Sequence, residues 1–262
     1  MLVAEILSIG NELLIGKTVN TNASWLGRRL TSMGFHVKRI VVVGDDVEEI
    51  AQAVREALAR GARVLITTGG LGPTFDDKTL EGVAAALQKP LVLHEEALRS
   101  IKEKYDAMGL PLTPAREKMA KLPEGAIPLP NSVGTAPGAM IELPNTLIFC
   151  LPGVPKEMQA MFDGSVASKL ASLNPSYKFY EHTVLIEGIP ESSLAPLIDK
   201  TMKSYPRVYI KSHPKGSEGR PIIEVHLSTF STSEEEAFAN LQGAADMLIQ
   251  LAEEHGAKRF KK

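Results

Sequence analysis

Residues 64–79 read VLITTGGLGPTFDDKT, and this stretch decides the fold. It opens with the apolar, β-rich run 64–68, continues with three glycines in four residues, and leads into a helical pattern over 77–88. Short apolar strands that alternate with helices are typical of a parallel sheet covered on both faces. The stretch therefore predicts a strand, a glycine-rich turn at its carboxyl end, and a helix.

The same alternation extends over residues 1–171. Further strands are predicted at 3–9, 37–43, 139–143 and 146–151, and helices at 23–33, 47–60, 95–108, 115–122 and from Pro155 onward. Asn22 is a suitable N-cap for the first of these helices. We therefore expect an α/β domain over 1–171, with a mostly parallel sheet and helices on both faces.

The pattern changes in residues 172–262. A strand at 182–187, a helix at 191–204, strands at 207–212 and 222–229, and a helix at 233–255 predict a small α+β domain of order β-α-β-β-α. Residues 215–219 are expected to form a flexible hairpin connection, and residues 258–262 a frayed basic end.

Composition excludes several classes of protein. Among 262 residues, Lys and Arg number 29 and Asp and Glu 31, so the formal net charge of −2 argues against general nucleic-acid binding. The single cysteine, Cys150, excludes a disulfide within the chain and a cysteine-rich zinc site, and its apolar strand predicts a buried, inert thiol. No apolar run approaches the ~18–20 residues that span a bilayer, so we expect a cytoplasmic protein without membrane contact.

Polar residues and glycines follow the predicted strands, where an open α/β sheet forms its ligand crevice. Glycine lets the backbone approach a ligand closely, and bare N–H groups before a helix favour an anion. The candidate substrate-binding residues are Gly10, Asn11, Glu12, Gly69, Gly70, Leu71, Gly72, Pro73, Thr74, Gly134, Thr135, Ala136, Pro137, Gly138, Pro152 and Gly153.

Three acids belong to the same predicted crevice. Asp45 could bind a metal, activate water or hold a ribose hydroxyl, whereas the neighbouring Asp46 is expected to cap the helix 47–60. Asp76 and Asp77 would repel a bare phosphate, so they indicate a divalent cation between carboxylates and phosphates, unless they only stabilise the helix start. Arg116 and Lys118 could reach a phosphate or could be solvated surface residues.

At this point the motifs resemble a known family. Residues 68–79, TGGLGPTFDDKT, resemble the signature of the MoaB/Mog molybdopterin-binding fold, and Leu71 with the Asp76–Asp77 pair resembles its CinA branch. Further similarity to that branch lies in residues 10–16, 131–138 and 151–158. Residues 172–262 resemble the KH-like domain that follows in CinA proteins. They contain no Gly-x-x-Gly loop, so RNA binding is not expected.

The resemblance implies a function and two alternatives. CinA domains of this type are associated with metal-dependent hydrolysis of ADP-ribose to AMP and ribose 5-phosphate, and Mog relatives bind molybdopterin and handle adenylylated intermediates. Asp76, where Mog proteins often have Arg, favours the hydrolase. We therefore predict a nucleotide pyrophosphatase with Asp45, Asp76 and Asp77 as catalytic residues, and Glu12, Asp76 and Asp77 as ligands of Mg²⁺, Mn²⁺ or Co²⁺. The alternatives are a molybdopterin-binding or adenylyltransferase-type protein and a non-catalytic nucleotide sensor.

Two further expectations follow from the resemblance. Many CinA proteins carry a C-terminal domain that deamidates nicotinamide mononucleotide, and this chain ends where that domain would begin, so no amidase activity is expected. A homo-oligomer, a dimer or higher, is expected, with a small nucleotide as the other binding partner.

Overall fold

The computed structural model describes residues 1–174, 176–215 and 221–259. It divides the chain into two compact units, residues 1–175 and 176–262, and the division lies four residues beyond the predicted boundary at 171. Among the described residues, no helix is long and apolar enough to cross a membrane.

The first unit is built on a six-stranded sheet of order β2-β1-β3-β8-β7-β6. The four strands β2 (His36–Val43), β1 (Val3–Ile9), β3 (Val64–Thr68) and β8 (Leu147–Leu151) run parallel. Strands β7 (Gly138–Glu142) and β6 (Ile127–Leu129) extend the sheet through two antiparallel pairings, β7 with β8 and β6 with β7. The predicted, mostly parallel sheet is confirmed.

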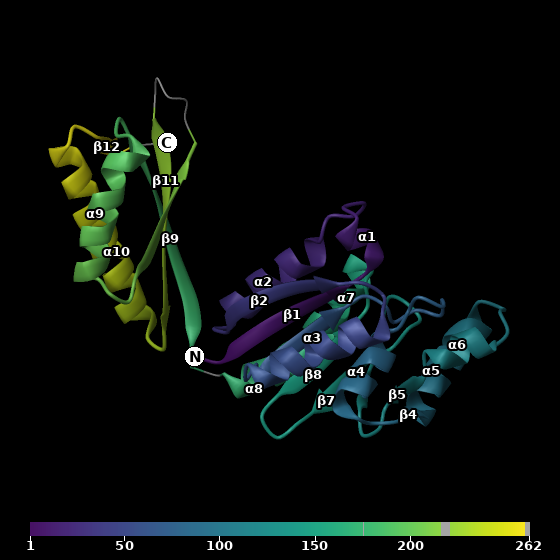
Figure 1. Cartoon of the computed structure of the whole chain (residues 1–262). Helices are drawn as coiled ribbons and strands as arrows, with labels where there is room; N and C mark the ends of the chain where they lie inside the picture. The colour runs from purple at the N-terminus through teal and green to yellow at the C-terminus, as the bar shows by residue number, and fades with distance from the viewer. Residues whose placement is uncertain (175, 216–220, 260–262) are drawn as a thin grey trace. The chain divides into compact units, whose positions relative to one another are not determined.

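Helices cover both faces of this sheet, as predicted (Figure 1). Side chains alternate along β1: Leu7 and Ile9 belong to the core beneath α3 (Val47–Ala59), α4 (Thr79–Leu87) and α5 (Glu95–Ala107). Ala4 and Ile6 belong to the opposite core, beneath α2 (Thr21–Ser32), α7 (Pro155–Met161), the π-helical turn η1 (Phe162–Val166) and α8 (Ala167–Leu173). Two separate apolar cores therefore fix the sheet from both sides.

The structure corrects several local predictions. Asn20, not Asn22, caps α2, because its side chain accepts a hydrogen bond from the backbone N–H of Ala23. Helix α4 begins at Thr79, so Asp77 precedes it. The predicted helix 115–122 splits into α6 (Pro114–Lys118) and β5 (Lys121–Pro123), and β5 pairs with the unpredicted β4 (Leu91–Leu93). Asp46 caps α3, as predicted.

The second unit is an antiparallel sheet of order β10-β11-β9-β12 with two helices. Its elements are β9 (Lys178–Glu187), α9 (Glu191–Ser204), β10 (Tyr209–Pro214), β11 (Ile222–Ser231), α10 (Glu234–Glu254) and β12 (Lys258–Arg259). Apolar side chains of three strands and both helices form its own core. The order β-α-β-β-α is present and is extended by β12, which pairs with β9.

The C-terminal end and the predicted hairpin connection of this unit are described only in part. Lys258 and Arg259 form a strand instead of the expected frayed end, because β9 offers them backbone hydrogen bonds. The rest of that end, residues 260–262, and residues 216–219 of the predicted hairpin connection lie outside the described residues.

Candidate functional site

The carboxyl ends of three adjacent parallel strands lie at one edge of the first unit's sheet. Ser8 of β1 is in register with Thr68 of β3, and Thr68 is in register with Leu151 of β8. The segments that follow these strands therefore begin side by side. This is the edge at which open α/β sheets bind their ligands.

The glycine-rich turn after β3 is held tightly to its surroundings. Gly69 and Gly70 have φ angles of 109° and 63°, in the region that favours glycine. A Cβ atom at Gly69 would overlap the carbonyl oxygen of Ile9, and one at Gly70 would overlap Oγ1 of Thr79. Oγ1 of Thr79 also donates a hydrogen bond of 2.7 Å to the carbonyl oxygen of Gly69. The turn is therefore fixed against both β1 and the first residue of α4.

This turn has backbone N–H groups that the described part of the chain does not use. The N–H of Gly69 donates to the carbonyl oxygen of Leu151 at 3.1 Å, so it is not available to a ligand. The N–H groups of Gly70, Leu71 and Gly72 have no hydrogen-bond partner among the described residues. Three successive free donors, in a turn whose Gly70 carbonyl oxygen accepts from the N–H of Thr79 at the start of α4, form an arrangement that suits an anion.

Asp76 and Asp77 belong to a turn organised by Thr74. The backbone N–H of Thr74 donates to Oδ2 of Asp77 at 2.8 Å, and its hydroxyl group contacts both carboxylates. The hydrogen bond from Thr74 is the main reason that the pKa of Asp76 lies below its usual value. Nζ of Lys118 donates to the backbone carbonyl oxygens of Thr74 and Asp77, at 3.1 and 2.7 Å. These contacts favour the ionised form of Asp76 and hold both side chains in one place.

The other predicted acids lie in different surroundings. Oδ2 of Asp45 accepts a hydrogen bond of 2.8 Å from the backbone N–H of Asn11, which ties the end of β2 to the segment after β1. The carboxylate of Glu12 folds back over Gly10. The described residues contain no group of three or more Asp, Glu, His or Cys side chains that could hold a metal ion, so the structure does not bring the predicted ligands Glu12, Asp76 and Asp77, or Asp45, together in one metal site.

A second rigid loop faces the glycine-rich turn. Oδ1 of Asn131 accepts from the N–H groups of Val133 and Gly134, at 3.1 and 2.8 Å, and its Nδ2 donates to Glu157 at 2.7 Å. Nζ of Lys104 donates to the backbone carbonyl oxygens of Asn131 and Gly134. Burial lowers the pKa of Lys104, and the charge of Glu157 opposes that shift. The motif of residues 131–138 pointed to this loop, but nothing in the sequence predicted Lys104 as its anchor.

Three cavities lie along the strand-end edge, and each is named here by one residue of its wall. The Lys118 cavity, of about 460 Å³, is lined by Gly70, Leu71, Gly72, Asp77, Leu80, Glu81, Leu91, Lys118, Met119 and Lys121. The Glu157 cavity, of about 330 Å³, shares Gly70, Leu71, Gly72, Asp77 and Met119, and adds Pro73, Thr135, Ala136, Pro152, Gly153, Val154 and Glu157. The Asn22 cavity, of about 90 Å³, lies beyond Gly153 and includes Glu12 and Gly69.

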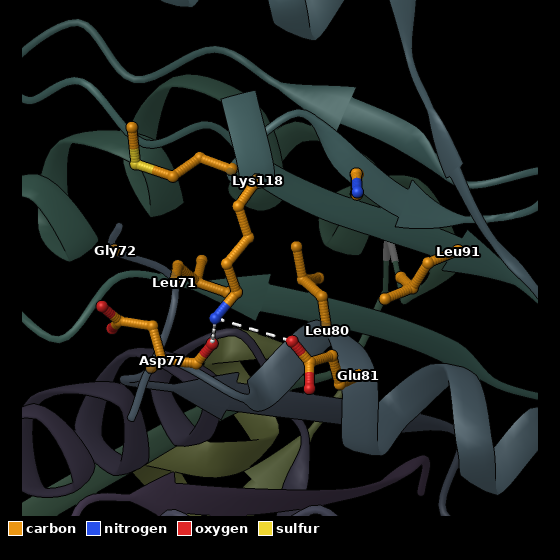
Figure 2. A pocket seen from close by; sticks show the side chains of 10 residues that line it. Leu71, Gly72, Asp77, Leu80, Glu81, Leu91 and Lys118 are labelled. Carbon is orange, nitrogen blue, oxygen red and sulfur yellow. Dashed lines mark hydrogen bonds and ion pairs between the residues drawn. The ribbon is translucent and has the colours of Figure 1, made fainter. Parts of the chain in front are cut away.

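Figure 2 shows how Lys118 defines the largest of these cavities. Its side chain extends to the backbone carbonyl group of Asp77 and to the carboxylate of Glu81, 3.5 Å from Nζ. Lys118 is therefore a basic residue of this site whose charge is already paired with Glu81, and Lys121 is a second basic residue in the same wall. Arg116 instead stacks on the ring of Tyr105, 4.1 Å from its centroid, and donates to the carbonyl oxygen of Pro111.

The predicted site residues thus divide into two groups. The wall of at least one cavity includes Glu12, Gly69, Gly70, Leu71, Gly72, Pro73, Asp77, Thr135, Ala136, Pro152 and Gly153. These walls do not include Gly10, Asn11, Asp45, Thr74, Asp76, Gly134, Pro137 and Gly138. Gly138 belongs to β7, where a Cβ atom would overlap Sδ of Met161, so packing explains this glycine.

The two larger cavities provide only some of the ligands that a divalent cation needs. Each of the two larger cavities has two carboxylates, Asp77 with Glu81 or Asp77 with Glu157. Glu81 is paired with Lys118, and Glu157 accepts from Asn131, so Asp77 is the carboxylate that is best placed. Mg²⁺ is often held by one or two carboxylates together with substrate phosphates and water. A cation would therefore depend on the phosphates of a ligand.

Fold and crevice together define an open α/β protein with its candidate site at the carboxyl edge of a parallel sheet. The family model described as "Probable molybdopterin binding domain" matches residues 5–172, and the chain belongs to this family. The chain is also similar to the protein CinA from Thermoplasma acidophilum, whose structure describes its function as unknown. The identity is 45%, the TM-score 0.61, and the match covers 64% of this chain and 97% of that one.

Two relatives of similar length extend the similarity over both units. A protein of Aeropyrum pernix is 51% identical over 254 residues, which are 97% of this chain and 94% of the relative. A protein of Pyrobaculum arsenaticum is 49% identical over 249 residues, 95% and 94% of the two chains. The resemblance to the MoaB/Mog family and to CinA is confirmed. The family description agrees with the molybdopterin-binding alternative better than with the hydrolysis of ADP-ribose.

Proposed function

We propose that this protein binds a phosphorylated pterin of the molybdopterin class, with the phosphate at the N–H groups of Gly70, Leu71 and Gly72. The observation that carries the proposal is that these three successive donors are free and lie in the wall shared by the two larger cavities. The N-terminus of α4 adds a favourable dipole. The family description supports the identity of the ligand.

The volumes of the cavities fit such a ligand. Binding sites for small molecules usually occupy ~300–1,000 Å³, and the Lys118 and Glu157 cavities measure about 460 and 330 Å³. Two such cavities on either side of one phosphate site could hold the ring system and a second group, such as a nucleotide, at the same time. This arrangement suits a protein that orients a pterin phosphate for nucleotidyl transfer.

The second candidate function is that of a metal-dependent nucleotide pyrophosphatase that hydrolyses ADP-ribose to AMP and ribose 5-phosphate. It is favoured by the adjacent acids Asp76 and Asp77, because carboxylates repel a bare phosphate and a cation between them would remove that repulsion. A bound cation would supply charge neutralisation at the phosphorus atom that water attacks. Asp77 would hold that cation, and the N–H groups of residues 70–72 would orient the diphosphate.

One variant separates the two candidates. Asp77→Asn removes a negative charge next to the phosphate site. If the protein only binds a pterin phosphate, affinity for molybdopterin and for AMP stays equal to that of the wild type or rises. If it is a metal-dependent hydrolase, release of AMP from ADP-ribose with Mg²⁺, Mn²⁺ or Co²⁺ is lost, as it is with EDTA.

The experiment combines calorimetric binding with chromatography of products from ADP-ribose, NAD, FAD and ATP. Binding of molybdopterin without turnover of any compound supports the first candidate. Binding of ADP-ribose alone, without turnover, supports the nucleotide sensor. Failure of every phosphorylated ligand to bind would overturn the proposed phosphate site. A homo-oligomer is part of the same proposal, and light scattering would give a multiple of the 28.3 kDa chain mass.

A further inference from the structure

Asn22 connects three elements at the strand-end edge. It is the second residue of α2, and its side chain lies in the interior with 8% of its surface exposed. Its Nδ2 group donates to Oγ1 of Thr68 at 3.0 Å and to the carbonyl oxygen of Gly153 at 2.8 Å. The side chain therefore joins α2 to the ends of β3 and β8.

These partners determine which way the Asn22 amide points. The hydroxyl group of Thr68 donates its single proton to the carbonyl oxygen of Pro152 at 2.9 Å, so it can only accept from Asn22. The carbonyl oxygen of Gly153 can also only accept. The group that faces both must therefore be the NH₂ group, which has two protons to donate. The amide oxygen, Oδ1, points the other way.

Oδ1 of Asn22 has no hydrogen-bond partner among the described residues, although it is buried. Asn20, in the same wall, is satisfied: its Oδ1 accepts from the N–H of Ala23 and its Nδ2 donates to Oγ of Ser8. Leaving a buried acceptor unpaired costs free energy, so native proteins pair such atoms with protein, water or ligand.

The cavity whose wall includes Asn22 favours a donor. The Asn22 cavity, of about 90 Å³, has room for more than one water molecule. Its wall includes the carboxylate-bearing Glu12. The Glu12 carboxylate and Oδ1 of Asn22 would repel a second phosphate, whereas O–H or N–H groups of a ligand would find acceptors in them.

We infer that Oδ1 of Asn22 accepts a hydrogen bond from a neutral donor edge of the bound ligand, which makes Asn22 a specificity-determining residue. The inference rests on the proposed phosphate site at residues 70–72. Gly153 lies in the walls of both the Glu157 and the Asn22 cavities, so a ligand held by its phosphate can extend toward Asn22. Two chemical sources supply such an edge: the hydroxyl groups of a ribose, or the amino-oxo edge of a pterin or guanine.

The test removes a hydrogen-bond donor from the ligand and, separately, the acceptor Oδ1 of Asn22 from the protein. Binding of AMP is compared with that of 2′-deoxy-AMP and 3′-deoxy-AMP, and binding of GMP with that of IMP, which lacks the 2-amino group. Each comparison is made in the wild type and in Asn22→Leu. The phosphate is the same throughout, so the parent nucleotides report the proposed function and the differences report the inference.

We expect a loss of affinity in only one of the two series of nucleotides. In the wild type, removing the donor that reaches Asn22 weakens binding by about tenfold, which corresponds to ~1.4 kcal/mol. The Asn22→Leu variant should bind the parent ligand about as weakly as the wild type binds the ligand without the donor. Removing the donor from the ligand should not weaken binding to this variant any further. Loss in the deoxynucleotide series identifies a ribose, and loss from GMP to IMP identifies an amino-oxo edge.

Thr146→Val is the matched control. It also removes a buried side-chain hydrogen bond to a backbone carbonyl group, 2.7 Å from Thr146 to Ala62, but it lies at the opposite end of β8. It should bind every nucleotide as the wild type does.

The outcomes distinguish the inference about Asn22 from the proposed phosphate site at residues 70–72. If the parent nucleotides bind and no donor-deleted ligand loses affinity in the wild type, the inference is overturned and the phosphate site stands. An equal loss in the wild type and in Asn22→Leu overturns the inference as well. If no nucleotide and no molybdopterin binds, the proposed phosphate site fails and the inference fails with it. Should Asn22→Leu not fold, the wild-type series alone decides.

Discussion

The carboxylate of Glu5 is buried within the sheet. It lies at the end of β1 that is remote from the crevice. Glu5 is 1% exposed, and its two oxygens accept from Nε and Nη2 of Arg60 at 3.0 and 2.7 Å. The Arg60 side chain is 25% exposed, so it can reach water if it loses its partner. The two halves of this ion pair are therefore not equivalent.

We predict that Arg60→Met lowers the free energy of unfolding by about 3 kcal/mol, because it leaves a buried carboxylate without a partner. Glu5→Gln should cost about 1 kcal/mol, because an amide oxygen still accepts from Arg60 and no buried charge is left behind. Urea denaturation of both variants measures the difference. Equal costs would contradict the asymmetry. Both variants should bind nucleotides as the wild type does.

Cys150 is the second residue whose surroundings lead to a prediction. It is fully buried in β8, and burial raises its pKa from 9.0 to about 12. The predicted burial of this thiol is confirmed, and its inertness remains a prediction. The native protein should not react with a thiol reagent at pH 8, and the unfolded protein should react once.

The raised pKa of Cys150 also sets a pH dependence. Below pH 9 the thiol is protonated in both states, and between pH 9 and 12 only the unfolded state loses the proton. Stability should therefore fall across this window, by up to about 1.4 kcal/mol per pH unit from this group. Cys150→Ala should be less stable at pH 8 but should show a smaller slope. Identical slopes for the two proteins would rule out this contribution.

At the level of single residues, the sequence was informative where chemistry is local. The glycines of the turn after β3 were predictable because few other residues adopt their backbone angles. Asn22 was misinterpreted as a cap because Asn20 is the same residue type two positions earlier, and only the register of β3 and β8 reveals its contacts. Lys104 and Glu5 gave no sequence signal, since their partners lie 27 or more positions away.

Among the elements, helices α3 and α4 pack closely at Gly82. A Cβ atom there would lie 2.5 Å from both Cβ and Cγ2 of Ile50. In α2, a Cβ atom at Gly27 would meet nothing closer than 4.0 Å. The two glycines are both within helices but differ in the space around them.

This difference gives a paired prediction. Gly27→Ala should raise the free energy of unfolding by up to ~1 kcal/mol through helix propensity. Gly82→Ala gains the same propensity but forces α3 and α4 apart, with a net loss of about 1–2 kcal/mol. Thermal unfolding of the two variants checks the opposite signs. A stabilised Gly82→Ala would show that the two helices can separate without cost.

The elements themselves were predictable in proportion to their length. Strands β1, β2, β3 and β8 and the long helices were recognised because their apolar residues are regularly spaced. Strands β4, β5 and β6 have three residues each, two of them contain proline, and no periodic pattern is visible at that length. The start of α4 was placed two residues early because Asp76 and Asp77 are also typical of a helix start.

For the whole molecule, the two units have separate cores. Residues 4–170 supply both buried cores of the first unit, and residues 184–257 supply the core of the second. We predict that a fragment of residues 1–175 unfolds cooperatively on its own. It should bind the phosphorylated ligand within about threefold of the affinity of the full chain, because the walls of the three cavities described above lie within it.

Circular dichroism with thermal melting tests the folding of that fragment, and calorimetry tests its binding. The complementary fragment, residues 176–262, is the control and should bind no phosphorylated ligand. A well-folded first fragment that does not bind would show that the second unit contributes to the site.

The order of strands has a consequence for when the site comes into existence. Thr68 pairs with Leu151, so the central strand pair of the crevice joins segments 83 residues apart. During synthesis the chain folds from its N-terminus, and such distant pairings form late. The glycine-rich turn is therefore made early but lacks its facing wall until β8 and residues 152–157 have left the ribosome. A ligand can therefore bind only after β3 and β8 have paired, so it stabilises the folded chain but does not act on the first steps of folding.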